Sequence, residues 1–251
     1  MSIWLRRIGA PNHGAPNHGE TAIRLVCFPH AGGAASFFSS WDALLPGAEL
    51  YAVRYPGRAE RINEPCATDL RVLAASIAEA IAGQGWAGPV ALFGHSLGAV
   101  IALETARTLD ALGRPAAHLF ASGSRNAALP EQDEHEADAD DAVQLLELGG
   151  TPAELTADPE FLEVVLPYIQ ADTRLFHGYQ HRAEPVLSCP VTTIAGDVDM
   201  HADRRPWHQL TWSLTEHVVP GHHFYLLDQP PADLIAAELN ELNELNEGVR
   251  S

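Results

Sequence analysis

One short stretch near the middle of the chain most constrains its fold. Apolar residues over Val90–Phe93 predict a buried strand, and the pattern over Ala99–Leu112 predicts a helix. Between them stands Gly94-His95-Ser96-Leu97-Gly98, in which a glycine lies two residues to either side of Ser96. A very tight turn from strand to helix requires such small residues. The turn lifts the serine hydroxyl above the sheet and places the Leu97 N–H at the start of the helix, where it can stabilise a developing oxyanion.

Length and charge set the broad class. The chain has 251 residues, of which 46% are hydrophobic, and this suits one α/β domain over 1–251. A net charge of −18 argues against nucleic acid and anionic membranes as partners. Neither an export signal nor a run of about 18 apolar residues is present, so we expect a cytoplasmic protein. We also expect it to be a monomer. The three cysteines (Cys27, Cys66, Cys189) have no metal-site spacing, which favours free thiols, two of them buried.

The N-terminal segment contains a short repeat. Ala10-Pro-Asn-His-Gly14 is followed at once by Ala15-Pro-Asn-His-Gly19. Proline, asparagine and glycine at this density favour a mobile loop over a strand or helix, so we expect 1–20 to be flexible. A metal site formed by the two histidines is the less favoured alternative.

A second turn follows the first interior strand. Ile23–Phe28 predicts that strand, and Pro29-His30-Ala31-Gly32-Gly33 comes directly after it. A phosphate-binding loop would need a dinucleotide fingerprint or a Gly-Lys-Ser/Thr sequence, and both are missing. The other use of such a loop is a backbone donor for an oxyanion, and Ala31 N–H is our choice beside Leu97 N–H. A plain tight turn remains the alternative.

The next segments are less informative about function. Phe37–Leu45 predicts an amphipathic helix and Glu49–Val53 a strand. Arg54-Tyr55-Pro56-Gly57-Arg58, with Arg61 beyond, supplies arginines that either contact a substrate phosphate or hold local carboxylates, and the sequence does not separate the two. Further elements are predicted as a helix over Thr68–Ala82 with Thr68 as its N-cap and a strand over His118–Ser122.

The regular pattern breaks at Arg125–Arg182. Glu131–Asp141 contains seven carboxylates in eleven residues, which is typical of a solvated, mobile face. Pro159–Gly178 predicts one or two helices with more apolar side chains than one exposed helix needs, among them Phe161, Leu166 and Phe176. Because this segment is inserted between two strands of the sheet, we expect a helical lid over the serine. An ordinary core helix is the alternative.

The last part of the chain supplies an acid and a base. A strand over Val191–Ala195 ends in Gly196-Asp197-Val198-Asp199, where an orienting carboxylate belongs; Asp199 is preferred and Asp197 is the alternative. Asp203 is expected to open a short helix. A strand over Thr215–Val219 leads to His222 and His223, either of which could act as the base, and Ala232–Glu247 predicts a terminal helix.

Together these motifs resemble the type II thioesterases of polyketide and nonribosomal peptide biosynthesis. The resemblance runs from about Ile23 to Leu239 and rests on Cys27-Phe28-Pro29-His30-Ala31-Gly32-Gly33, Arg54-Tyr55-Pro56-Gly57-Arg58, Gly94-His95-Ser96-Leu97-Gly98, Gly149-Gly150-Thr151-Pro152, Gly196-Asp197-Val198-Asp199 and His223-Phe224. It implies an α/β-hydrolase fold, with a mostly parallel sheet flanked by helices and an inserted helical lid. It also implies Ser96 as nucleophile, Asp199 as orienting acid and His223 as base.

The resemblance further implies the substrate. An acyl or peptidyl carrier protein would present an acyl chain as a thioester on its phosphopantetheine arm, and no metal or cofactor would be needed. His30, Phe161, Leu166 and Phe176 are expected to contact that substrate. The chain departs from the family pattern at its N-terminal repeat, at His222 and at Met200. A general serine esterase or lipase, and a non-catalytic binding protein of the same fold, remain the alternatives.

Overall fold

The computed structural model describes residues 2–9, 23–130, 145–146, 148, 150–151 and 153–248. Three sequence predictions concern segments that lie wholly or largely outside these residues: the flexible stretch 1–20, the Asn-His-Gly repeat within it, and the acidic run Glu131–Asp141.

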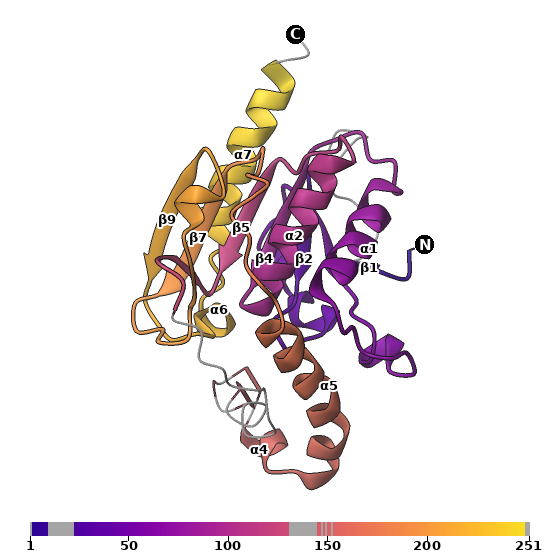
Figure 1. Ribbon diagram of the computed structural model, residues 1–251. Helices are drawn as coiled ribbons and strands as arrows, with labels where there is room; N and C mark the ends of the chain where they lie inside the picture. Colours follow the sequence, from indigo (N-terminus) through magenta and orange to yellow (C-terminus); the bar gives the residue numbers. More distant parts are fainter. Residues whose placement is uncertain are drawn as a thin grey trace.

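A seven-stranded sheet forms the centre of the molecule (Figure 1). Its strands lie in the order β1-β3-β2-β4-β5-β7-β9, and every neighbouring pair is parallel except β1 with β3. Two further strands, β6 and β8, form a small parallel pair. The bounds are β1 Leu5–Arg7, β2 Arg24–Phe28, β3 Glu49–Val53, β4 Val90–His95, β5 His118–Ser122, β6 Ser124–Asn126, β7 Val191–Gly196, β8 Asp203–Arg205 and β9 Leu214–Val219.

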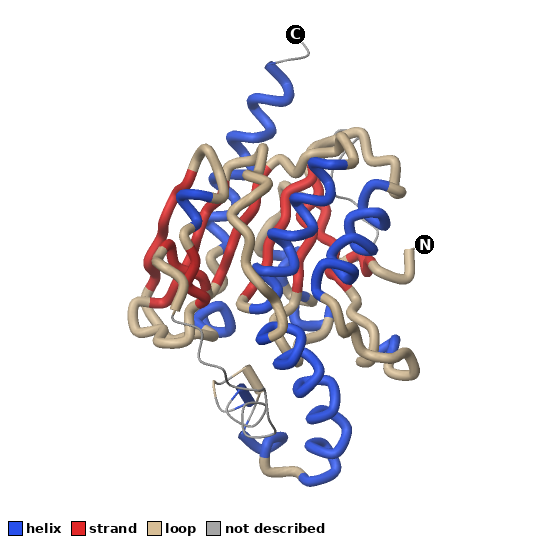
Figure 2. The backbone as a smooth tube through the Cα atoms, in the orientation of Figure 1, coloured by secondary structure: helices blue, strands red, loops and turns tan. Residues whose placement is uncertain are grey.

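Helices cover both faces of this sheet (Figure 2). α1 (Leu70–Ala82) and α2 (Leu97–Ala111) pack on one face, and α7 (Ala232–Gly248) lies on the other with two 3-10 turns. The remaining helices are α4 (Ala153–Thr156), α5 (Pro159–His177) and α6 (Tyr225–Asp228), and the 3-10 turns are Ala35–Phe38, Trp41–Ala43, Ala59–Arg61 and Trp207–Gln209. Of the helices in the described ranges, none is both long and apolar enough to cross a bilayer.

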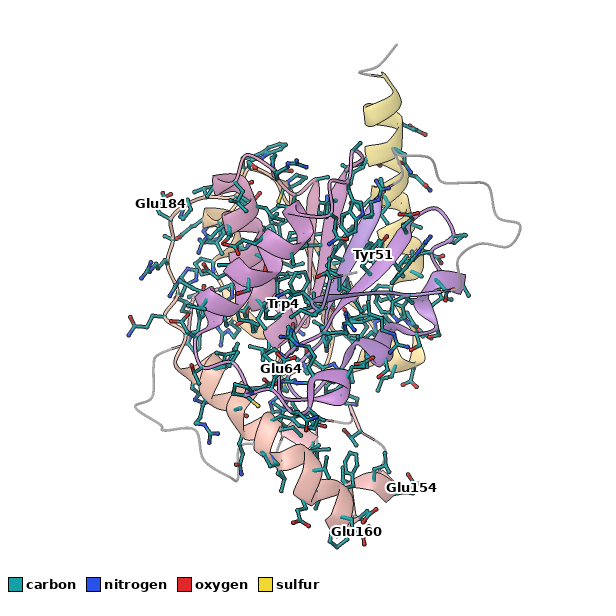
Figure 3. The ribbon with its side chains drawn as sticks, turned by 90° about the vertical axis from the view of Figure 1, so that its right-hand side faces the viewer. Trp4, Tyr51, Glu64, Glu154, Glu160 and Glu184 are labelled. Carbon is teal, nitrogen blue, oxygen red and sulfur yellow. The ribbon has the colours of Figure 1, made fainter. Side chains whose placement is uncertain are left out.

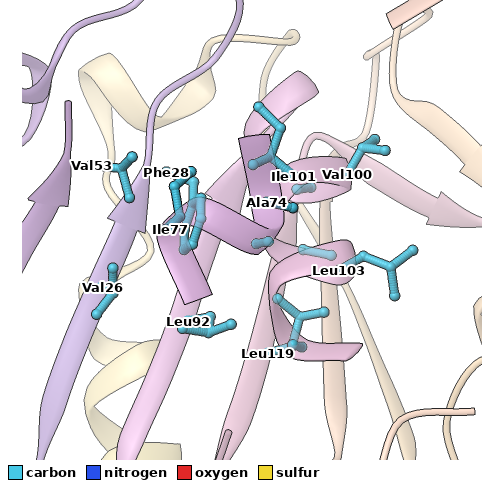
Figure 4. Packing of buried hydrophobic residues seen from close by; sticks show 14 of the residues in the cluster. Val26, Phe28, Val53, Ala74, Ile77, Leu92, Val100, Ile101, Leu103 and Leu119 are labelled. Atoms are coloured by element: carbon cyan, nitrogen blue, oxygen red, sulfur yellow. The ribbon is translucent and has the colours of Figure 1, made fainter. Parts of the chain in front are cut away.

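The central strands are buried on both faces, as a parallel sheet between two helical layers requires. Val26 and Phe28 of β2 point into the cluster formed with α1 and α2, while Leu25 and Cys27 point into the opposite cluster. Figure 4 shows the first cluster, where Ile77 of α1 lies close to these strand residues. Continuous apolar runs in the sequence therefore correspond to the interior strands. Cys27 and Cys189 are buried free thiols, as expected.

The predicted helix over Phe37–Leu45 is wrong. The structure has two separate 3-10 turns there, Ala35–Phe38 and Trp41–Ala43. The break between them turns the rings of Phe38 and Trp41 toward the core, where their centroids lie 5.0 Å apart and where Trp41 lies 4.9 Å from Phe93. This aromatic packing is therefore made by two separate turns and not by one regular helix.

Two smaller predictions are also corrected. The N-cap of α1 is Asp69 and not Thr68, because the Asp69 carboxylate accepts hydrogen bonds from the N–H groups of Arg71 and Val72. Asp203 begins strand β8 and not a helix, since its N–H donates to the Gly123 carbonyl and its strand pairs with β6. The sequence prediction missed β1, an antiparallel edge strand of three residues.

The two described helices between β6 and β7 project beyond the carboxyl ends of the parallel strands (Figure 1). α4 and α5 form this projection, and Figure 3 shows Glu154 and Glu160 at its outer end. Ligands of parallel α/β sheets bind at the carboxyl ends of the strands. The projection therefore lies on the side of the sheet where the predicted site residues converge.

Candidate active site

Ser96 occupies a strained turn between β4 and α2. Its φ of 55° and ψ of −122° lie in a region that residues with a side chain rarely adopt, at a cost of about 1–3 kcal/mol. A Cβ on Gly94 would stand 2.2 Å from the Gly98 carbonyl oxygen, and one on Gly98 would stand 2.2 Å from the Phe28 carbonyl oxygen. Both glycines are therefore required, and Ser96 is half-buried where its neighbours are fully buried.

Ser96 opens into a cavity of about 210 Å³. Ala31, Leu97 and His223 also line this cavity, so with Phe176 it brings together five of the residues singled out from the sequence. Its far wall includes Phe176 from α5.

His223 is held by a buried carboxylate. Its Nδ1 lies 2.9 Å from Oδ2 of Asp199, and the Asp199 Oδ1 accepts the His201 N–H at 2.9 Å. Burial alone would raise the pKa of Asp199, but the hydrogen bond and charge of His223, with help from the His201 N–H and Arg125, outweigh it and hold that pKa below its usual value. Asp199 is therefore ionised at neutral pH and fixes the orientation of the His223 ring.

The alternative acid and base are placed elsewhere. Asp197 is exposed, and its carboxylate accepts the Gly221 N–H at 2.8 Å, which braces the turn before His223. His222 is exposed, whereas His223 is buried and faces Asp199. The structure therefore brings together Asp199 and His223, and leaves Asp197 and His222 outside the pair.

The two backbone amides chosen as oxyanion donors are available. Over the described residues, neither the Ala31 N–H nor the Leu97 N–H is paired with an acceptor. The neighbouring Gly32 N–H, by contrast, donates to Oδ2 of Asp172 at 2.8 Å and is not available. Within this loop, the geometry favours Ala31 over Gly32 as the donor.

The four residues expected to contact substrate fall into different places. Phe176 lines the cavity that holds Ser96. His30 and Phe161 line a second cavity of about 190 Å³, which shares Ala31 with the first. Leu166 lines neither of these cavities in the described part of the chain; it packs against a small cluster that includes Val165 and Ile169.

Two buried histidines stand beside His223 and stay neutral. Burial lowers the pKa of His30 to about 3, with smaller contributions from the charges of His223 and Arg58. Burial likewise holds the pKa of His95 well below its usual value. His95 Nδ1 lies 2.8 Å from the Ser122 Oγ, so this ring is fixed without a charged partner. Neither histidine therefore places a competing positive charge beside the His223–Asp199 pair.

Sequence reasoning missed Asp172. This side chain of α5 binds both Gly32 and Arg58 and lines the Ser96 cavity. A signal was present, because Asp172 follows Val165 and Ile169 at helical spacing and so interrupts the apolar face of α5. A carboxylate on a buried face needs a cationic partner. The partner is Arg58, which decides between the two uses left open for these arginines: Arg58 holds a local carboxylate.

Comparison with known proteins agrees with this architecture. The Thioesterase domain family matches residues 23–240. The chain belongs to the thioesterase family. It is 39% identical over 238 residues to the thioesterase PikA5 of Streptomyces venezuelae, covering 90% of this chain and 81% of that protein.

Two solved structures are similar in fold. The type II thioesterase BorB from the borrelidin biosynthetic cluster has a TM-score of 0.78 at 32% identity, covering 95% of this chain and 98% of that one. YbtT, a type II thioesterase from the yersiniabactin NRPS/PKS pathway, has a TM-score of 0.79 at 26% identity, covering 95% and 99%. The resemblance to type II thioesterases, the α/β-hydrolase fold and the class of thioester hydrolase are thus confirmed.

Proposed function

We propose that this thioesterase hydrolyses acyl chains from the phosphopantetheine arm of acyl or peptidyl carrier proteins in polyketide or nonribosomal peptide biosynthesis, and so edits or releases those chains. One observation carries the proposal: a strained serine opens into the same cavity as a histidine whose Nδ1 is bound to a buried aspartate. BorB, from the borrelidin biosynthetic cluster, and YbtT, from the yersiniabactin NRPS/PKS pathway, supply the context of secondary metabolism.

The proposed reaction has two halves. Because Asp199 accepts the Nδ1 proton of His223, Nε2 is the basic nitrogen and takes the Ser96 proton as Oγ attacks the thioester carbonyl. The C–S bond breaks, the pantetheine sulfur takes that proton from His223, and an acyl-enzyme ester remains. Water then gives a proton to His223, attacks the ester and releases the acid, and the proton returns to Ser96.

The negative charge of each tetrahedral intermediate falls on the former carbonyl oxygen. We assign its stabilisation to the N–H groups of Ala31 and Leu97, which line the cavity and are free of other acceptors over the described residues. Leu97 is the first residue of α2, so the positive end of that helix dipole adds to the effect. The two amides come from separate turns that follow β2 and β4, and both residues line the cavity that Ser96 also lines.

The two cavities and the net charge support a proposal for how the substrate and its carrier protein bind. Phe176 beside Ser96, and His30 and Phe161 in the adjoining cavity, are proposed to contact the acyl chain or the arm. With a net charge of −18, the enzyme has no global attraction for an acidic carrier protein, so docking is expected to be of modest affinity. We further propose that the protein acts as a monomer in the cytoplasm, without metal or cofactor.

An oxygen-ester hydrolase is the second candidate, because the same serine and histidine could open an ester. Steady-state hydrolysis should be compared for one acyl group presented as carrier-bound thioester, free pantetheine thioester and oxygen ester, with Ser96→Ala as the inactive control. Our proposal expects the highest kcat/KM on the carrier-bound thioester. An equal or higher kcat/KM on the oxygen ester would refute it in favour of the second candidate.

A further inference from the structure

Asp172 of α5 is a buried carboxylate that reaches the loop carrying Ala31. Its side chain is 6% exposed, and Oδ2 accepts the Gly32 N–H at 2.8 Å. Both carboxylate oxygens are bound by Arg58, each at 2.5 Å. A carboxylate this deeply buried is stable only when charges and donors satisfy it. One of those donors is here the backbone amide that follows Ala31.

Arg58 extends the contact to the next residue of the loop. Its Nη1 also donates to the Gly33 carbonyl oxygen at 3.3 Å. The guanidinium carbon lies 5.3 Å from the Tyr55 ring centre and 5.1 Å from that of Tyr168, so two aromatic faces hold the plane of the group. A planar, two-pronged cation fixed in this way sets the direction of the groups it binds.

The backbone of the loop also packs directly against the Ile169 side chain of α5. Gly32 has a φ of +76°, and a Cβ there would stand 2.9 Å from Cγ1 of Ile169, one turn before Asp172. At the other end of the loop, the Tyr55 hydroxyl donates to the Pro29 carbonyl at 3.1 Å. The Pro29–His30 peptide and the Ala31–Gly32 peptide are thus tied to other parts of the molecule, one on each side of the peptide that carries the Ala31 N–H.

We propose that Arg58 and Asp172 are positioning residues for the oxyanion site. Together they set the direction of the Ala31 N–H, and they make that direction depend on the docked position of α5. Neither residue acts on the substrate itself. The inference rests on the proposed function, because the Ala31 amide matters only if an oxyanion forms at Ser96. A reacting group displaced by about 1 Å loses about 100-fold in rate, so even a small movement of this loop is costly.

The test uses Asp172→Asn and Arg58→Lys, with Glu104→Gln as matched control. Asparagine keeps an acceptor for Gly32 but removes the charge opposite Arg58, and lysine keeps the charge but cannot form the two-pronged contact. Glu104 of α2 is a comparably buried carboxylate, bound by Arg107 at 2.9 Å, and is not among the residues that bind the loop.

Four quantities are measured for each variant and the wild type: kcat and KM on a free acyl-pantetheine thioester, the affinity of a trifluoromethyl ketone analogue, and the affinity of the matching thioether. The ketone forms a tetrahedral adduct with Ser96 that carries an oxyanion, whereas the thioether binds without one. Thermal unfolding and circular dichroism establish that each variant is folded.

We expect Asp172→Asn and Arg58→Lys to lose about 10- to 100-fold in kcat and in ketone affinity, with KM and thioether affinity unchanged. Glu104→Gln should leave all four quantities unchanged. Folded variants that keep full ketone affinity, or that lose ketone and thioether affinity equally, would overturn the inference. If Asp172→Asn does not fold, Arg58→Lys and the uncharged double variant Arg58→Gln/Asp172→Asn decide the same question. A wild type that forms no ketone adduct would instead contradict the proposed function.

Discussion

The backbone of Ser96 holds the serine in a conformation that only the surrounding glycines permit. In the proposed mechanism Ser96, His223 and Asp199 act as one unit. Removing the Ser96 hydroxyl is therefore expected to lower kcat by about 10³-fold or more. Ser96→Ala should keep the melting temperature of the wild type, since the Oγ is not needed for packing. Turnover on an acyl thioester and thermal unfolding check the two halves of this prediction. A variant that retains near-normal turnover would show that Ser96 is not the nucleophile.

The stability of the folded protein depends on pH partly through Asp199. Its pKa is lower in the folded chain than in the unfolded chain, so it stabilises the fold above its unfolded pKa, and this stabilisation is lost as pH falls through the folded pKa. Asp199→Asn should therefore flatten the dependence of unfolding free energy on pH below about pH 5, where the carboxylate of an unfolded aspartate begins to bind protons. It should also lower kcat at neutral pH, because His223 loses its orienting partner. Urea titrations across this range measure the effect, with Asp197→Asn as the control. An equal flattening in Asp197→Asn would show that the pH dependence does not come from Asp199 in particular.

The base can be assigned in the same way. His223→Ala is expected to lower kcat about as far as Ser96→Ala does, whereas His222→Ala should retain turnover because its side chain is exposed and lies outside the Asp199 pair. Separate assays of the two variants on one acyl thioester decide the point. The opposite pattern would move the base to His222.

Single residues differ in how far their placement could be predicted from sequence. Ser96 could be placed because a strand, two glycines and a helix fix its turn locally. Asp199 was preferred to Asp197 from its place in the Gly-x-x-Asp turn, and His223 to His222 by resemblance, whereas the contact that pairs Asp199 with His223 joins segments 24 residues apart. Asp172 was missed because its partner Arg58 is 114 residues away, and its interruption of the apolar face of α5 does not identify that partner.

Among the elements, α5 departs most from expectation. The sequence indicated a mobile lid over Arg125–Arg182, but the last turns of α5 are tied to the core through Asp172 and Leu175. The first turns, near Glu160, are largely exposed. Motion of the projection stays a prediction, and it belongs to α4 and the start of α5 rather than to the whole segment.

Hydrogen exchange tests this division of α5. We expect the amides of residues 171–177 to exchange nearly as slowly as those of β4, because opening them would expose a buried ion pair. The amides of residues 161–164 should exchange faster and slow down when a non-hydrolysable acyl-carrier analogue binds. Uniform protection along α5 in the free enzyme, unchanged on binding, would show that the helix does not gate the cavity.

The elements of the sheet were predicted better than those around it. Interior strands such as β2, β4 and β5 are short apolar runs whose burial on both faces leaves a direct mark in the sequence. The Phe37–Leu45 prediction failed because its apolar spacing fits a helix, while the packing of Phe38 and Trp41 decides the actual turns. β1 has only three residues and depends on pairing with β3, which no local pattern records.

At the scale of the whole molecule, the net charge of the enzyme is expected to influence its association with the proposed carrier protein. The net charge of −18 should repel an acidic carrier protein at low ionic strength. Raising the salt concentration is therefore expected to lower KM for a carrier-bound thioester and to leave KM for a free pantetheine thioester nearly unchanged. Parallel kinetics over a salt series measure this. A KM for the carrier substrate that rises with salt would show that local arginines dominate the docking.

The account as a whole depends on an acyl-enzyme formed at Ser96. The most direct measurement mixes the enzyme rapidly with an acyl-pantetheine thioester, quenches with acid, and locates the added acyl mass by peptide mass spectrometry. We predict a transient adduct on the peptide that contains Ser96, absent in Ser96→Ala and formed much more slowly in His223→Ala. Hydrolysis by the wild type with no adduct at any time, or an adduct on another residue, would contradict it.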